Sequence, residues 1–182
     1  MKIAQEKWLY LIILSLLWGS SFILTKKALL GVSPVQLGAL RIIFTAVLLL
    51  VFASSSLKKI QKKHYRYIVF TSLAGTFIPG FLFAFAILHI DSAVTSILNS
   101  LTPFNTLILG SVFFGFGFKK KQFYGIIIGL VGTLILIING AVINTNQNYW
   151  YALLVIVASV CYATNANMVK KYLYDLNALS IV

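Results

Sequence analysis

The chain has 182 residues, of which 60% are hydrophobic and 10% are charged, whereas soluble domains carry about 25% charged residues. This composition excludes a soluble globular domain and indicates a membrane protein. The net charge of +12 does not indicate nucleic-acid binding, because the 15 basic residues fall in short clusters between long uncharged stretches. The single cysteine, Cys161, excludes an intrachain disulfide and a cysteine-rich metal site. We therefore expect membrane lipid as a partner, and neither nucleic acid, metal nor cofactor.

Six stretches are apolar enough to cross a membrane as helices, which requires roughly 17 to 25 mostly apolar residues each. None shows the alternating pattern of a transmembrane β-strand. The sequence predicts an all-α membrane protein, a polytopic helical bundle of about six transmembrane helices. In chain order the stretches are 8–24 (extending as far as residue 30), 35–53, 67–88, 93–118, 123–143 and 149–168.

Lysine and arginine are distributed unequally between the two sides of this bundle. The connections after the second and fourth stretches are basic, and so is the N-terminus, whereas the connections after the third and fifth stretches contain no Lys or Arg. Lys26 and Lys27, after the first stretch, are the exceptions. Because basic loops stay on the cytoplasmic side, we predict a multi-pass protein of the cytoplasmic membrane with a cytoplasmic N-terminus.

A short phrase occurs twice. "WGSSFILTKK" (18–27) aligns with "YATNANMVKK" (162–171), pairing Trp18 with Tyr162 and each lysine with a lysine. This weak repeat suggests a duplicated unit of five spans, whose two copies are inverted because five is odd. We expect one complete unit over residues 1–143 and the start of a second over 144–182. The polar face of Thr164, Asn165 and Asn167 should then lack most of the helices that would satisfy it.

Four segments in order carry a resemblance to a known family. They are "WGSSFILTKKAL", "SPVQLGALRIIFTAVLLL", "AVTSILNSLTPFNTLILGSVFFG" and "KKKQFYGIIIGLVGTLILI". Together they resemble the EamA domain of the drug/metabolite transporter superfamily, whose members are exporters built from two five-helix repeats. The resemblance implies a secondary transporter that exports small metabolites or drugs by alternating access. It also implies that the chain stops after the first helix of the second repeat, either as a fragment or as a short form that pairs with another chain.

Two basic residues lie near the outer ends of the first two spans. Arg41 is about seven residues into its span, where a charge is costly unless it faces a cavity or a partner or snorkels to the surface. The functional alternative is that Arg41 and Lys26 give the outer vestibule a positive field for anionic solutes. Trp18 and Ser20, and Asn165 in the second copy of the phrase, complete this part of the expected substrate pathway.

The fourth stretch contains a polar cluster around Pro103. Thr95, Asn99, Thr102 and Thr106 follow the spacing i, i+4, i+7, i+11, so we expect them to share one helical face. That face should point into the bundle, either lining the pathway or forming interhelical hydrogen bonds. Pro103 removes an internal hydrogen bond and predicts a kink, and Pro79 predicts a similar break in the third stretch.

The fifth stretch carries Gly125, Gly129 and Gly132 at GxxxG spacing, which predicts close helix packing within the bundle or between protomers. An intramembrane enzyme is excluded by the residue inventory, because no acid pair, HExxH motif or Ser/His arrangement lies within a span. Transport of a small-molecule solute is the favoured function. The alternatives are a non-transporting membrane or assembly subunit, and a half-size transporter that works as a homodimer or with a second-half partner.

Overall fold

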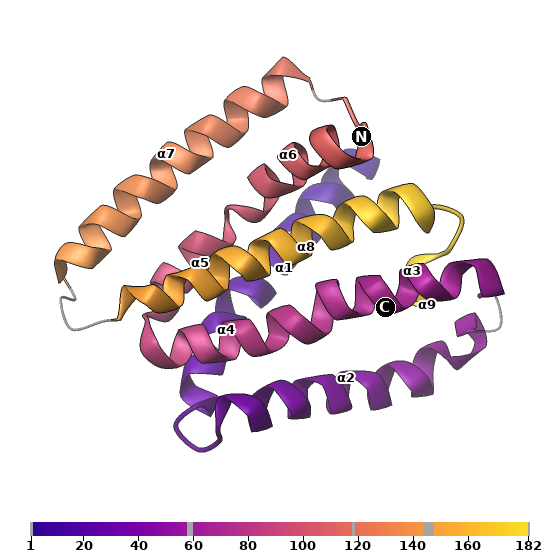
Figure 1. Cartoon of the computed structure of the whole chain (residues 1–182), viewed down its shortest axis with the longest axis horizontal. Coiled ribbons are helices and arrows are strands. Elements are labelled where there is room, and N and C mark those ends of the chain that lie inside the picture. Colours follow the sequence, from indigo (N-terminus) through magenta and orange to yellow (C-terminus); the bar gives the residue numbers. More distant parts are fainter. Residues whose placement is uncertain (1, 58–59, 118, 144–147, 182) are drawn as a thin grey trace.

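The computed structural model describes residues 2–57, 60–117, 119–143 and 148–181, and every regular element within them is helical (Figure 1). This confirms the all-α polytopic fold class. The elements are α1 (Lys2–Ala28), α2 (Pro34–Leu57), the 3-10 turn η1 (Lys62–His64), α3 (Tyr65–Ser72), the π-helical turn η2 (Leu73–Phe77), α4 (Ile78–His89), α5 (Ser92–Asn99), α6 (Thr102–Phe114), α7 (Lys120–Ile143), the 3-10 turn η3 (Tyr149–Tyr151), α8 (Ala152–Tyr172) and α9 (Ala178–Ile181).

Five helical segments of the described chain are long and apolar enough to span a membrane. They are Trp8–Ala28, Pro34–Ser54, Lys62–His89, Ser92–Phe114 and Ala152–Tyr172. Each corresponds to one predicted stretch, and the remaining stretch, 123–143, coincides with the 24-residue helix α7. The predicted end at residue 118 and the residues after the expected unit boundary, 144–147, lie outside the described part of the chain.

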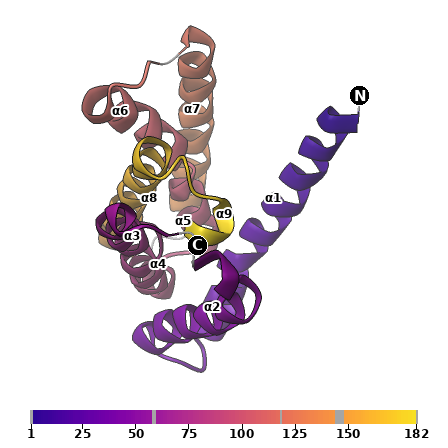
Figure 2. The same cartoon turned by 90° about the vertical axis from the view of Figure 1, so that its right-hand side faces the viewer.

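Helix α8 occupies the middle of the bundle. It packs against α4 on one side and α6 on the other, and it also contacts α3 and α5 (Figure 1). The buried apolar core lies where α4, α5 and α8 meet, and it includes the fully buried Ala86, Val155 and Ala158. Helix α2 packs on the outer side of α4, and the N-terminal half of α1 diverges from the other helices (Figure 2).

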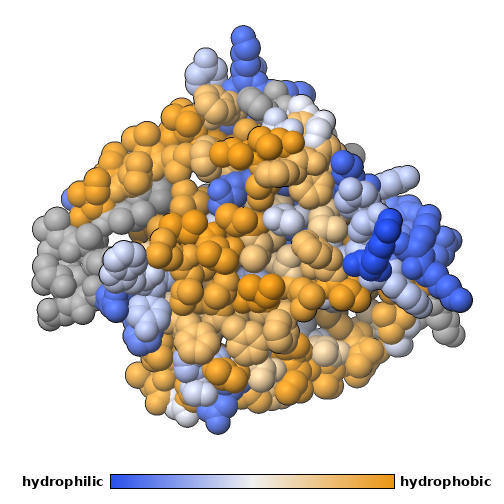
Figure 3. Space-filling model, in the orientation of Figure 1, coloured by the Kyte–Doolittle hydropathy of each residue, from blue (hydrophilic) through white to orange (hydrophobic). Residues whose placement is uncertain are grey.

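The outer surface is apolar over the middle of the molecule. Large exposed side chains such as Trp8, Phe52 and Ile128 lie on three different helices. Apolar residues cover most of the face in Figure 3, and hydrophilic residues gather mainly at its edges. A mostly apolar face of this kind is what a lipid environment requires.

Two of the spans are broken at the predicted prolines. The segment from Lys62 to His89 changes from α-helix to the π turn η2 just before Pro79, and the Ile78 N–H donates to the Leu73 carbonyl five residues earlier. The next span stops at Asn99 and restarts as α6 with Pro103 in its first turn. Proline cannot donate to the carbonyl four residues before it, but it fits the first turn of a helix. The breaks predicted at both prolines are confirmed.

Candidate functional site

A line of polar side chains runs along α8 and the facing surface of α6. We call it the polar seam and define it as Ser159 and Asn167 of α8 with Asn105 and Thr106 of α6. Ser159 is fully buried and Asn167 is 3% exposed. Hydroxyl and amide groups at such depth in an apolar bundle require hydrogen-bond partners.

One direct side-chain contact joins the two helices. Asn105 Nδ2 donates to Ser159 Oγ at 2.7 Å, and Ser159 Oγ donates in turn to the carbonyl of Ile156 at 2.7 Å. The amide therefore extends a chain of hydrogen bonds from α6 to the backbone of α8.

Asn167 links the same two helices further along the seam. Its Nδ2 donates to the carbonyl of Thr106 in α6 and to the carbonyl of Ala163 in its own helix, both at 2.9 Å. A Cβ built on Gly110 would lie 2.6 Å from Asn167 Oδ1. Glycine at position 110 therefore allows α6 to approach the Asn167 side chain.

Asn165 lies against the π turn on the opposite side of α8. A Cβ on Gly75, within η2, would lie 2.7 Å from Asn165 Cγ, so glycine is needed for this contact as well. Gly75 is the residue whose carbonyl Pro79 cannot reach with an N–H. The side chain of Asn165 is thus placed at the irregular backbone of the broken span.

The polar residues of the second copy of the repeated phrase are well accommodated. Thr164 Oγ1 donates to the carbonyl of Val160 at 2.9 Å, and Asn167 makes the two bonds described above. The expectation that this face lacks its partners is wrong for Thr164 and Asn167, because the backbone of α8 satisfies Thr164, and the backbones of α6 and α8 satisfy Asn167.

The break before Pro103 also corrects the predicted helical face of the fourth stretch. Thr95 and Asn99 lie on α5, whereas Thr102 and Thr106 lie on α6. Thr95 is fully buried and donates to the carbonyl of Asp91 at 3.0 Å. Thr102 Oγ1 donates to Asn99 Oδ1 at 3.2 Å across the break. The four residues therefore do not share one continuous helical face, although Thr106 belongs to the seam.

The other predicted pathway residues occupy different places. Trp18 and Ser20 are exposed on α1, where Ser20 Oγ donates to its own backbone at the carbonyl of Leu17. Pro103 is exposed at the start of α6. The structure does not bring these three residues into the polar seam, because Trp18 and Ser20 are exposed on α1 and Pro103 lines a cavity between the start of α6 and α7.

Lys26 and Arg41 differ in their surroundings. Lys26 Nζ donates to the carbonyl of Ile87 at 2.6 Å and to that of Ile90 at 3.3 Å. Carbonyls at the end of α4 carry partial negative charge and lack helical partners, so the ammonium group caps that helix. Arg41 is exposed on α2 but close enough to Tyr162 of α8 to interact with it electrostatically.

The glycines of α7 do not make the predicted close approach within the described chain. A Cβ built on Gly125, Gly129 or Gly132 meets no atom of another segment within 4 Å. The reason is that α7 approaches the bundle mainly through α5. Packing of this face against another protomer stays a prediction.

The sequence analysis did not place Asn105, Ser159, Gly75 or Gly110 in the site, and it named Asn167 only as part of an unpartnered polar face. The available signal was the presence of polar or glycine residues inside apolar stretches. Within the described residues, no three His, Cys, Asp or Glu side chains come together in a way that could hold a metal ion.

Comparison with known proteins places most of this chain in one family. Residues 7–138 match the model of the EamA-like transporter family. Neither a search of curated proteins nor a search of solved structures gave a match. The matched segment covers α1 to α6 and most of α7, so α8 and its share of the polar seam lie beyond it.

Proposed function

Because the chain belongs to the EamA-like transporter family, a family of membrane transporters, we propose that it moves a small polar metabolite or drug across the cytoplasmic membrane. The proposed mechanism is alternating access, with the polar seam as part of the solute pathway. The observation that carries this proposal is the burial of Ser159 and Asn167 of α8 between apolar spans, where they are hydrogen-bonded to Asn105 and to the Thr106 carbonyl of α6.

Energetics favour a solute-binding role over a purely structural one. Hydrogen bonds between transmembrane helices contribute on average only about 0.6 kcal/mol each. Apolar side chains could supply comparable packing without the cost of burying amides. A seam of amides and hydroxyls is therefore better explained by contact with a polar solute, for which such groups provide both donors and acceptors.

The broken spans support a conformational cycle. Irregular backbone at membrane depth occurs where it is covered by protein or lines a cavity, and π turns inside helices are frequent at functional sites. Helix α8 contacts η2 through Asn165 on one side and α6 on the other, so bending at η2 would move the helix that carries the seam. Rocking about η2 and about the α5–α6 break could then open the seam alternately to the two sides.

Flux into proteoliposomes tests the proposal. The full chain is reconstituted and screened with a radiolabelled panel of amino acids, sugars and nucleosides together with cationic dyes. For any transported member, Ser159→Ala and Asn105→Leu should lower flux about tenfold, as expected for loss of one solute hydrogen bond of roughly 1.5 kcal/mol. Ser54→Ala makes the same change as Ser159→Ala on an exposed part of α2 and should leave flux unchanged. Equal flux in all three variants would contradict a pathway through the seam.

A second candidate is a non-transporting subunit or a half-size unit that needs another chain. The exposed apolar α1, whose N-terminal half diverges from the bundle, favours it (Figure 2). The same flux assay separates the two candidates when it is repeated with a second copy cross-linked to the chain, or with a co-expressed second half. Flux only in the presence of that partner would support the second candidate.

A further inference from the structure

Positive side chains gather at the end of the bundle where α3 begins and α8 ends. We call this the basic end, and it lies at the right of Figures 1 and 3, where hydrophilic residues cluster. A cavity of about 300 Å³ opens there between residues 63–67, around the start of α3, and residues 171–175, around the end of α8. It is separate from the polar seam and does not depend on the proposed transport pathway.

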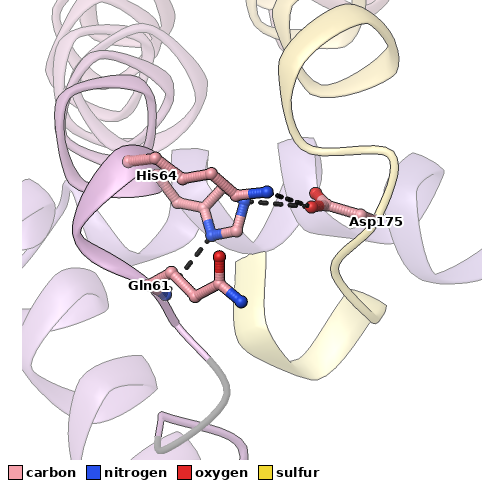
Figure 4. Close-up of polar contacts among 4 residues, drawn as sticks. Gln61, His64 and Asp175 are labelled. Atoms are coloured by element: carbon pink, nitrogen blue, oxygen red, sulfur yellow. Dashed lines mark hydrogen bonds and ion pairs between the residues drawn. The ribbon is translucent and has the colours of Figure 1, made fainter.

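A buried histidine holds the two sides of this cavity together. His64 is 3% exposed, and its Nδ1 accepts a hydrogen bond from the backbone N–H of Gln61 at 3.3 Å. Nε2 must therefore carry the proton, and it donates to Asp175 Oδ2 at 3.1 Å (Figure 4). Lys63 Nζ donates to the same oxygen at 3.0 Å. The cavity walls are thus fixed relative to each other before any ligand arrives.

The lining carries an excess of positive charge. Three cations, Lys63, Arg66 and Lys171, face one carboxylate, Asp175, which already accepts bonds from Lys63 and His64. Three positive charges against one negative charge leave a net charge of +2. In the described chain, Lys171 uses one of its three N–H donors on the carbonyl of Phe114. Donors therefore remain available for an anion.

Aromatic rings form a rigid wall beside these cations. Tyr67 and Tyr172 stack with their centroids 4.3 Å apart and their planes 5° from parallel. The Arg66 Cζ lies 4.5 Å from the Tyr67 ring centroid, and its Nη2 donates to the Tyr67 hydroxyl at 2.5 Å. A stacked guanidinium loses little further freedom when it binds an anion. Tyrosines at the end of apolar spans also lie at the depth of lipid headgroups.

We propose that the cavity at the basic end binds a phosphate group, carried either by an anionic lipid or by a small soluble molecule. Phosphate oxygens match the fork of Arg66 and the point charges of Lys63 and Lys171. A volume of about 300 Å³ corresponds to roughly ten water molecules, which accommodates a phosphate with part of its headgroup. Basic pockets between membrane helices at this depth are the usual form of such lipid sites.

Native mass spectrometry of the detergent-solubilised full chain tests the proposal with phosphatidylglycerol as the probe and phosphatidylcholine as the neutral reference. Arg66→Gln and Lys171→Gln should each weaken retention of phosphatidylglycerol about tenfold or more, as expected for losing a hydrogen bond to a charged group. The matched control pair is Lys120→Gln and Lys121→Gln, which remove exposed charges at the start of α7. Diffuse attraction accounts for only about fivefold per charge, so the controls should not exceed that.

Two further experiments distinguish a lipid phosphate from a free phosphate as the ligand and test whether the variants fold. Inorganic phosphate that displaces the lipid, or that binds the lipid-free chain and loses affinity in Arg66→Gln, assigns the site to phosphate in general. Failure of phosphate to compete assigns it to the lipid headgroup. Arg66→Lys, which keeps the charge, should retain part of the binding and shows that the variants fold. Equal losses in pocket and control variants, or no binding of either probe, would overturn the proposal.

Discussion

Gly110 shows how a single missing side chain shapes the contact of α6 with α8. A methyl group there would lie 2.6 Å from Asn167 Oδ1, and Asn167 cannot move away without losing its bonds to Thr106 and Ala163. We predict that Gly110→Ala lowers the stability of the folded protein by about 1–3 kcal/mol through overpacking. Thermal denaturation in detergent measures the change.

The matched control for this prediction is Gly19→Ala on α1. No atom lies within 4 Å of a Cβ built there, and alanine favours helix over glycine by roughly 0.5–1 kcal/mol. The two substitutions should therefore have opposite signs. A neutral or stabilising Gly110→Ala would show that the seam is more loosely packed than the structure indicates.

The sequence predicts that Lys26 and Arg41 together make the outer vestibule positive. The structure gives them different surroundings, so we expect Lys26→Gln and Arg41→Gln to affect stability and flux differently. Lys26→Gln removes a charged donor to the last carbonyls of α4 and should cost about 1.5–3 kcal/mol of stability. Arg41→Gln removes an exposed charge near Tyr162, so it should leave the melting temperature unchanged and reduce flux of anionic solutes. Thermal denaturation measures the stability of both variants, and the proteoliposome assay measures their flux of anionic solutes. Unchanged anion flux in Arg41→Gln would remove Arg41 from the pathway.

Asp175 makes the basic end sensitive to acid. The hydrogen bond from Lys63, assisted by that from His64, holds the pKa of the Asp175 carboxyl below its usual value. A group with a lowered pKa in the folded state adds stability above its ordinary pKa, and this stability is lost as the pH falls from there through the lowered value. Backbone amides of residues 173–176 should then exchange with solvent faster, as measured by hydrogen exchange. Asp175→Asn should show the fast exchange at neutral pH, and an unchanged pattern in that variant would contradict the link.

At the scale of the element, Pro79 and the π turn η2 together keep the span from Lys62 to His89 from forming one regular α-helix. Replacing Pro79 by alanine restores an N–H that can donate to the Gly75 carbonyl and favours a regular α-helix through the turn. We predict that Pro79→Ala raises thermal stability and lowers flux of any transported solute, because the span loses its bend. Pro34→Ala, at the first position of α2, removes a proline where no helical donor is needed and should change neither property. Increased flux in Pro79→Ala would argue against a hinge at η2.

The elements themselves could largely be predicted from the sequence, because long apolar stretches and prolines act locally. Apolar runs determine the helices, and Pro79 and Pro103 determine where two of them break. The same break invalidates the face that joined Thr95 to Thr106, since helical spacing holds only while the helix continues. Helical spacing indicates which residues lie on the same face of one helix. It does not indicate which other helix packs against that face.

The candidate site was therefore harder to predict from the sequence than the fold. The contact of Asn105 with Ser159 joins residues 54 positions apart, and that of Asn167 with Thr106 joins residues 61 apart. Both depend on α8 lying between α4 and α6, an arrangement that no local pattern specifies. The sequence identifies polar residues inside the spans as candidate site residues. The packing of the helices determines which of these residues are in contact.

At the scale of the whole molecule, the distribution of charge gives the bundle a direction. Lys63, Arg66 and Lys171 surround the cavity at the basic end, and further lysines, Lys119 to Lys121, lie at the start of α7. At the opposite end, the Lys26 ammonium donates to a carbonyl at the end of α4. Because this contact partly balances its charge, we expect Lys26 to contribute less to the orientation of the chain than the lysines of exposed loops do. The positive-inside rule then predicts that the basic end faces the cytoplasm.

Cysteine labelling checks this orientation. In a Cys161→Ala background, which removes the one native thiol, Lys62→Cys marks the basic end and Ala93→Cys marks the opposite end, both at exposed positions. A membrane-impermeant maleimide applied to intact cells should label position 93 and spare position 62, because only the opposite end faces outward. Permeabilised cells should label both positions, which confirms that each thiol is reactive. Labelling of position 62 in intact cells would reverse the orientation, and would place the phosphate cavity at the outer leaflet.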